Sequence, residues 1–171
     1  MRRRPETDDL RAAAVGVAAG LLAAWIMDRW QAGASPLLST YQEKAGVESP
    51  GGDATARAAD YISELARGRS VSDDNRATAG LKVHYAFGAL LGGLYGVVAG
   101  RWGGITAGFG SGFSLLVDLL FDEALVPAMR LSEPDDAYPA SSHAYGVVSH
   151  LIFGVALEGG RRLLLGRAAT E

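Results

Sequence analysis

Histidine and acidic side chains stand inside or at the ends of otherwise apolar stretches of this sequence, where charged groups are rare. Imidazole and carboxylate groups together suit Zn²⁺ and similar divalent ions. The same groups can relay protons, because histidine titrates near neutral pH. The sequence therefore predicts one candidate cluster that binds or relays protons or binds a divalent metal. Its members are His84, Asp118, Asp122, Glu123, His143 and His150. Two secondary candidates are Asp28 and Glu158.

Other chemistries have less support in the sequence. The chain has no Cys, which excludes a disulfide framework and a thiolate metal site. The HExxH motif of metalloproteases is absent, which weakens that interpretation. Serines adjoin His143 and His150, but neighbours along a helix point apart, so nucleophilic catalysis is poorly supported. The net charge of −3 argues against a nucleic-acid surface. A membrane-embedded metalloenzyme is therefore the least favoured function class.

Four apolar stretches must position these residues. Each approaches the ~20 residues that cross a hydrocarbon core of about 30 Å, and each is apolar nearly all round, unlike the helices of a soluble bundle. We predict an all-α, four-transmembrane-helix bundle that forms a single membrane domain over 1–171. The lipid bilayer is its expected surrounding, and the polar segment 31–80 is expected outside the membrane. The predicted spans cover about 10–30, 81–100, 103–126 and 144–165.

The distribution of arginine predicts the orientation of these spans. Short loops and termini that carry an excess of Lys and Arg stay in the cytoplasm. Four spans place the two termini and the short loop at Arg101 on one side, and that side holds most of the arginines near the span ends. We therefore expect both termini to be cytoplasmic. The other arginines on this side are Arg2, Arg3, Arg4, Arg11, Arg161, Arg162 and Arg167.

The polar segment contains a predicted amphipathic helix at Asp53–Arg67. Ala54, Ala58, Ile62 and Leu65 recur at helical spacing, and Asp53 could cap the first turn. We expect this helix to lie on the membrane surface or over the bundle, in preference to docking a partner. The following Ser-Val-Ser-Asp-Asp sequence from residue 70 indicates another helix start, which would run into the second span.

Glycines recur every four residues within three of the spans. Helices in lipid associate through close packing, and a row of small residues permits it. We therefore predict a tightly packed bundle, while the same rows could instead join two copies of the chain in a homo-oligomer. The rows are Gly16, Gly20 and Ala24; Gly88, Gly92, Gly96 and Gly100; and Gly104, Gly108 and Gly112.

Depth along the spans predicts which polar residues meet. With a rise of about 1.5 Å per residue, His150 lies roughly 10 Å inside the outer end of the fourth span, close to the level of Asp118. We predict a contact between these two, with Asp122 and His143 nearer the mouth and His84 entering from the second span. Glu158 lies toward the cytoplasmic end, where Arg161 and Arg162 are its expected partners.

Two function classes remain open at this stage. The polar cluster is a binding or relay site for protons or a divalent metal, or its members clip helices together in a structural or accessory membrane protein. A separate alternative to the His150–Asp118 contact is that His150 only hydrogen-bonds a serine or a backbone carbonyl. An isolated charge in the membrane is costly and marks a functional site by default, but a buried pair also holds helices together.

Several short motifs resemble the YagU-like inner-membrane proteins, the DUF1440 family. They include His84-Tyr-Ala-Phe-Gly, Leu94-Tyr-Gly and Asp122-Glu-x-x-x-Pro127. Tyr138-Pro-x-Ser-Ser-His143, His150-Leu-Ile-Phe-Gly154 and Glu158-x-x-Arg161-Arg complete the set. The resemblance covers most of the chain and is weakest over 31–75. It implies a multi-pass protein of the bacterial inner membrane without an established activity. It marks nearly the same polar residues, namely His84, Asp122, Glu123, His143, His150 and Glu158.

Overall fold

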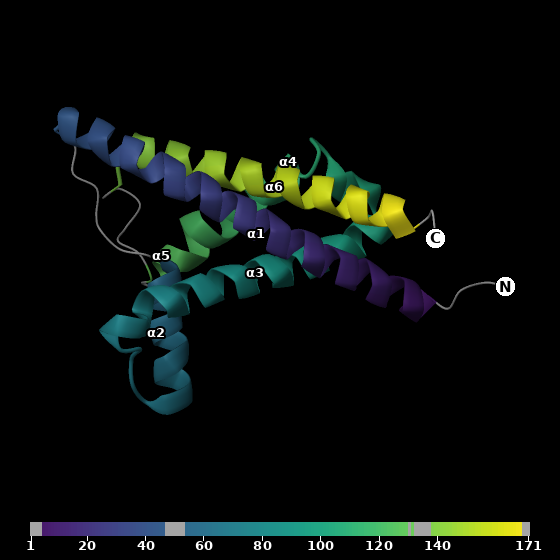
Figure 1. Ribbon diagram of the computed structural model, residues 1–171, viewed down its shortest axis with the longest axis horizontal. Coiled ribbons are helices and arrows are strands. Elements are labelled where there is room, and N and C mark those ends of the chain that lie inside the picture. Colours follow the sequence, from purple (N-terminus) through teal and green to yellow (C-terminus); the bar gives the residue numbers. More distant parts are fainter. Residues whose placement is uncertain (1–4, 47–53, 130, 132–137, 169–171) are drawn as a thin grey trace.

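The computed structural model describes residues 5–46, 54–129, 131 and 138–168, and the regular elements among them are all helices (Figure 1). Within these described ranges, three helices are long and apolar enough to cross a membrane. They are α1 (Pro5–Lys44), α3 (Asp73–Arg101) and α6 (Ala140–Ala168). The shorter elements are α2 (Ala54–Arg67), the 3₁₀ turn η1 (Gly103–Thr106), α4 (Ser111–Val117), the π-helical η2 (Asp118–Leu125) and α5 (Val126–Ala128).

Contacts at both ends show that α1 runs antiparallel to α3 and α6. Asp9 near the start of α1 pairs with Arg101 at the end of α3. At the other end, Gln42 donates to the hydroxyls of Ser141 and Ser142 in the first turn of α6. The beginning of α1 and the end of α6 consequently lie at the same end of the molecule (Figure 1).

Glycine brings the backbones of α1 and α3 into direct contact. A Cβ atom placed on Gly92 would lie 2.7 Å from the Cα of Gly20, and one placed on Gly88 would lie 2.8 Å from the Cβ of Ala24. Gly16 meets Gly92 and Gly96 in the same way. Beside this contact lies one apolar core, formed by Ala19, Ala23, Ala24, Met27, Leu91, Tyr95, Phe113, Val117, Phe153 and Leu157.

Helix α1 continues well beyond residue 30, where the predicted span ends. Pro36 lies inside the helix, and the hydroxyls of Ser39 and Thr40 donate to its carbonyl oxygen. The extension packs on α6, where Tyr145 donates to the Gln31 carbonyl. At 1.5 Å per residue the 40-residue helix is about 60 Å long, twice the hydrocarbon core, so part of it must project beyond any membrane.

The predicted span 103–126 is not one continuous helix. Gly108, Phe109 and Gly110 have φ angles of 62°, 58° and 85°, which an α-helix cannot contain. The helical run therefore begins at Ser111 and continues through α4, η2 and α5. The expected row of Gly104, Gly108 and Gly112 is wrong, because its first two members lie outside that run. This segment is not among the three candidate spans.

The amphipathic helix predicted before the second span is confirmed as α2, but its apolar stripe does not cover the bundle. Ala56, Ala59 and Ser63 are the buried residues, whereas Ile62 and Leu65 are exposed. Small side chains let α2 approach α3, where a Cβ on Gly80 would lie 3.0 Å from the Ala56 nitrogen. Asp53, the expected cap, lies outside the described residues. The predicted helix start near residue 70 is confirmed, since α3 begins after Ser72.

Candidate metal centre

The candidate site lies between the π-helical segment η2 and α6, which run antiparallel. Gly110, just before α4, approaches the Gly154 backbone of α6, and Asp118 at the start of η2 lies opposite Gly146 and His150. A π-helical turn is rare and is frequently found at functional sites, because its extra residue re-aims the side chains that follow. Here it carries both Asp118 and Asp122.

The predicted contact between His150 and Asp118 is confirmed. Nδ1 of His150 lies 3.0 Å from Oδ1 of Asp118, and both residues are buried. Nε2 of the same ring lies 3.7 Å from Oδ2 of Asp122, whose side chain is 53% exposed. Each residue offers one ligand atom such that all three atoms lie within 4.8 Å of one another, the spacing of a potential metal site. Asp122 therefore belongs to the same group as Asp118.

Hydrogen bonding assigns the proton on the His150 ring. Nδ1 also lies 3.1 Å from the Gly146 carbonyl oxygen, which can only accept, so Nδ1 carries the hydrogen and shares it with Asp118. In the neutral ring the lone pair is then on Nε2, on the side of Asp122. A carboxylate on one ring nitrogen is the arrangement that orients metal-binding histidines in proteins.

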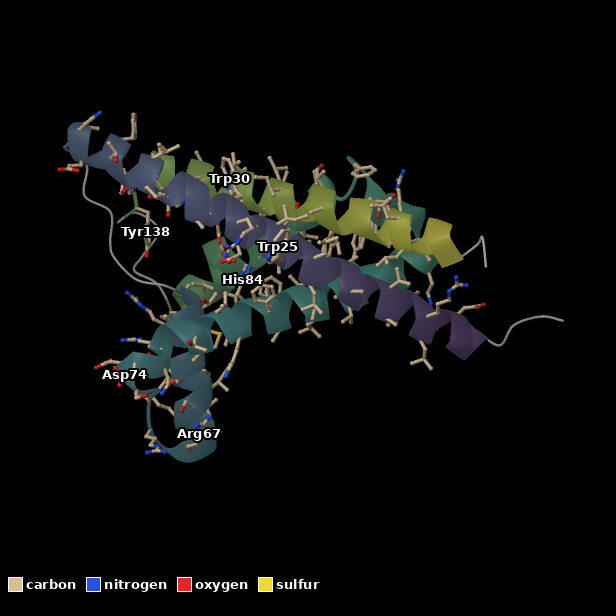
Figure 2. All side chains as sticks on the ribbon, in the orientation of Figure 1. Trp25, Trp30, Arg67, Asp74, His84 and Tyr138 are labelled. Atoms are coloured by element: carbon tan, nitrogen blue, oxygen red, sulfur yellow. The ribbon has the colours of Figure 1, made fainter. Side chains whose placement is uncertain are left out.

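Other predicted members of the cluster lie elsewhere. His84 places Nε2 3.2 Å from the Ala24 carbonyl of α1 and lies between α1 and α3 (Figure 2). His143 lies beside Tyr138, with ring centroids 6.4 Å apart. Neither belongs to the three-residue group. The expectation that His84 enters this group is wrong, because the close contact of α3 with α1 offers its ring a nearer backbone acceptor. The Glu123 side chain lies outside the described residues.

The two secondary candidates have their own partners. Asp28 pairs with the neighbouring Arg29 at 2.6 Å. Glu158 is fully buried and accepts from Arg161 at 2.7 and 2.9 Å and from Arg162 at 2.6 Å, which confirms the expected pairing. Sequence reasoning missed the third donor, the Tyr95 hydroxyl at 2.8 Å. A buried tyrosine hydroxyl needs a partner, so its place within an apolar span was the available signal.

A second set of polar contacts joins α1 to α6 beside the site. The indole nitrogen of Trp30 donates to the Ser149 hydroxyl at 3.2 Å, and that hydroxyl donates to the Tyr145 carbonyl at 2.8 Å. The sequence had drawn attention to Ser149 only as a neighbour of His150. The Ser149 hydroxyl therefore holds α6 against α1 at the position next to His150.

Comparison with known proteins places the chain in a family. No curated protein and no solved structure matches it. A family model described as DUF1440, protein of unknown function, matches residues 63–159. That range includes all of α3, the interrupted helical segment and α6 as far as Gly159, and therefore every residue of the candidate site. Since the match covers more than half of the sequence, the chain belongs to the DUF1440 family.

Proposed function

We propose that this protein binds a divalent cation at Asp118, Asp122 and His150, inside a helical bundle of the bacterial inner membrane. The observation that carries the proposal is the His150 ring, anchored through Nδ1 by a buried carboxylate and directed through Nε2 toward a second one. Nε2 of His150 and the Asp122 carboxylate would hold the ion directly, with Asp118 orienting the ring through Nδ1, and imidazole and carboxylate ligands suit Zn²⁺ or Mn²⁺. A proton competes for the same lone pair on Nε2, so proton binding belongs to the same site.

A four-pass topology supports this placement of the site. The end of α3 lies beside the start of α1, and α6 begins beside the end of α1. If α1, α3 and α6 each cross the membrane, the chain between α3 and α6 must cross it as well, and the helical run from Ser111 to Ala128 makes that return. Both termini then lie on one side, and the arginine distribution favours the cytoplasm.

The second candidate function is structural, and a specific observation favours it. Asp118 and the Gly146 carbonyl already accept the Nδ1 hydrogen of His150, so this pair holds η2 against α6 without a further ligand. Each such hydrogen bond between membrane helices contributes about 1 kcal/mol or less. In that case the polar residues clip the bundle together, and the protein acts as a scaffold or accessory subunit.

Asp122 separates the two functions. Its side chain is half exposed and 3.7 Å from the ring, so it adds little to a clip, but it supplies a ligand to a metal. We expect wild-type protein in detergent to bind Zn²⁺ or Mn²⁺ in calorimetric titration, and Asp122→Asn to weaken binding by about tenfold or more without lowering the melting temperature. Asp28→Asn, beside exposed Arg29, is the matched control and should bind as wild type.

Two results would overturn the metal proposal. One is wild-type protein that takes up neither ion at a defined stoichiometry, measured by elemental analysis after dialysis. The other is Asp122→Asn protein that binds the ion as tightly as wild type does. Either result leaves the clip as the function of the His150–Asp118 contact, which Asp118→Asn would then weaken in the metal-free protein.

A further inference from the structure

A groove of about 630 Å³ lies between α2 and the first turns of α3, away from the metal centre. Three cationic residues line it: Arg67 and Arg69 at the end of α2 and just after it, and Lys82 on α3. Ser63, Ser70 and Asn75 add hydroxyl and amide groups. None of the described residues that line the groove is acidic, so its charge is complementary to an anion.

The nearby acidic residues do not neutralise these cations. Asp60 on α2 pairs with Arg76 at 2.6 Å and also accepts from the Val71 backbone nitrogen at 3.1 Å. Glu64 accepts from the Ser70 hydroxyl. Among the described residues, Arg67, Arg69 and Lys82 make no ion pair with a carboxylate. The lining itself therefore carries three positive charges, with Glu64, Asp73 and Asp74 as acidic neighbours just outside it.

The outer face of α2 is apolar. Leu65 is 72% exposed and Tyr61 is exposed, both on the side opposite the residues that pack on α3, and Ile62 is 54% exposed beside them, where it also lines the groove. Helix α2 also lies crosswise to α1, α3 and α6 (Figure 1). Since α3 is a candidate span, a helix crosswise to it at its first turns lies roughly in the plane of the membrane. An apolar stripe, a charged edge and this orientation are typical of an interfacial helix.

We propose that α2 lies in the membrane interface, with Tyr61, Ile62 and Leu65 among the lipids, and that the α2–α3 groove binds the phosphate of an anionic phospholipid. Lys82 sits at the start of the apolar part of α3, and its long side chain can reach the headgroup level. Leu81, next to Lys82, and Leu90, farther along α3, are exposed and offer a surface for the acyl chains. A lipid uses both the cations and the stripe, whereas a free anion uses only the cations.

Short-chain lipids test the groove in detergent-solubilised full-length protein. We expect dihexanoyl phosphatidylglycerol to raise the melting temperature, while dihexanoyl phosphatidylcholine and inorganic phosphate do not. Each cation near a membrane surface contributes roughly fivefold in affinity, so Lys82→Gln with Arg69→Gln should weaken binding about twenty-fivefold. Lys44→Gln, at the end of α1, is the control that keeps wild-type affinity.

Three outcomes would contradict the lipid site. They are equal shifts with both lipids, a double variant that binds as wild type does, or a full shift produced by inorganic phosphate alone. The last would identify a site for free anions instead of lipid. Metal uptake at Asp122 is a separate measurement, so failure here leaves that proposal standing.

The depth of α2 can be measured directly, because the chain contains no Cys. Single spin labels on Leu65→Cys and Asp74→Cys, in vesicles of phosphatidylcholine and phosphatidylglycerol at 4:1, report their surroundings. Asp74 lies in the first turn of α3, at the end of that helix away from the bundle (Figure 2). We expect oxygen to relax the Leu65 label and a water-soluble nickel chelate to relax the Asp74 label. Equal access of the chelate to both labels would refute the membrane-bound position of α2.

Discussion

Replacing Gly92 with alanine should destabilise the bundle, although alanine is the better helix former. A Cβ at this position would lie 2.7 Å from the Cα of Gly20 and 2.9 Å from its nitrogen, and it would come still closer to the Gly16 carbonyl. Ordinary van der Waals contact begins near 3.4 Å. The two helices must therefore separate by about 0.7 Å or more at this level, and backbone atoms, unlike the end of a flexible side chain, cannot simply rotate away.

Two opposing contributions set the change in unfolding free energy for Gly92→Ala. Alanine in place of glycine in a helix gains roughly 0.5–1 kcal/mol. Overpacking an interface costs about 1–3 kcal/mol, and the loss here extends to neighbouring contacts because both helices are rigid. The net change for Gly92→Ala is thus destabilising, and Gly92→Leu is worse. Gly33 has no atom within 4 Å of an added Cβ, so Gly33→Ala should be stabilising by the helix term alone.

Thermal unfolding followed by circular dichroism in detergent measures this contrast. Gly100→Ala is a second control at the α1–α3 contact, because its Cβ would lie 3.9 Å from that of Ala12, an ordinary contact that does not force the helices apart. The expected order of melting temperature is Gly33→Ala highest and Gly92→Ala lowest, with Val97→Leu close to wild type. Equal melting temperatures for the Gly33 and Gly92 variants would refute the idea that direct backbone contact holds α1 to α3.

Three further predictions concern other contacts in the bundle. Glu158→Gln should lose about 3–5 kcal/mol of unfolding free energy because it breaks a buried ion pair and leaves Arg161, whose side chain is only 14% exposed, without its carboxylate. Arg162→Gln, at an exposed partner, should lose about 1 kcal/mol or less in the same denaturation assay. In whole cells, Asn75→Cys should react with an impermeant maleimide and Trp102→Cys should not; the reverse pattern contradicts the orientation. Gly154→Ala, whose Cβ would lie 2.8 Å from that of Ser114, should weaken metal binding in calorimetry without touching a ligand, and unchanged affinity would show that α4 does not set the site.

The helices could be predicted where the sequence pattern alone requires a helix, through a long apolar stretch or through apolar residues at helical spacing. Long apolar stretches identified α3 and α6, and helical spacing identified α2. The continuation of α1 past Pro36 could not be predicted, because residues 31–44 are polar and their helix depends on tertiary contacts such as Gln42 with Ser141. The break before Ser111 was also missed, since glycine spacing typical of a packed helix is compatible with the left-handed turn that the structure contains.

Depth arithmetic found the His150–Asp118 contact because both residues lie on helical segments that run antiparallel. The same arithmetic failed for His84, because its depth matched that of the cluster but its side chain points toward α1. The ring turns to the Ala24 carbonyl, since α3 lies closer to α1 than a generic bundle would allow. Depth alone therefore narrows the candidates for a membrane site, and the packing distance between helices decides among them.

The register between the interrupted segment and α6 explains how the site is built. Gly110 contacts the Gly154 backbone, and Gly110 is as far from Asp118 along the chain as Gly154 is from Gly146. In antiparallel helices this spacing brings Asp118 level with Gly146, where a Cβ would lie 3.7 Å from Oδ1 of Asp118. The left-handed turn ending at Gly110 therefore does more than interrupt a span. It fixes where α4 begins, and with it the level at which η2 presents its first carboxylate to His150, while the π-helical turn carries the second carboxylate toward Nε2.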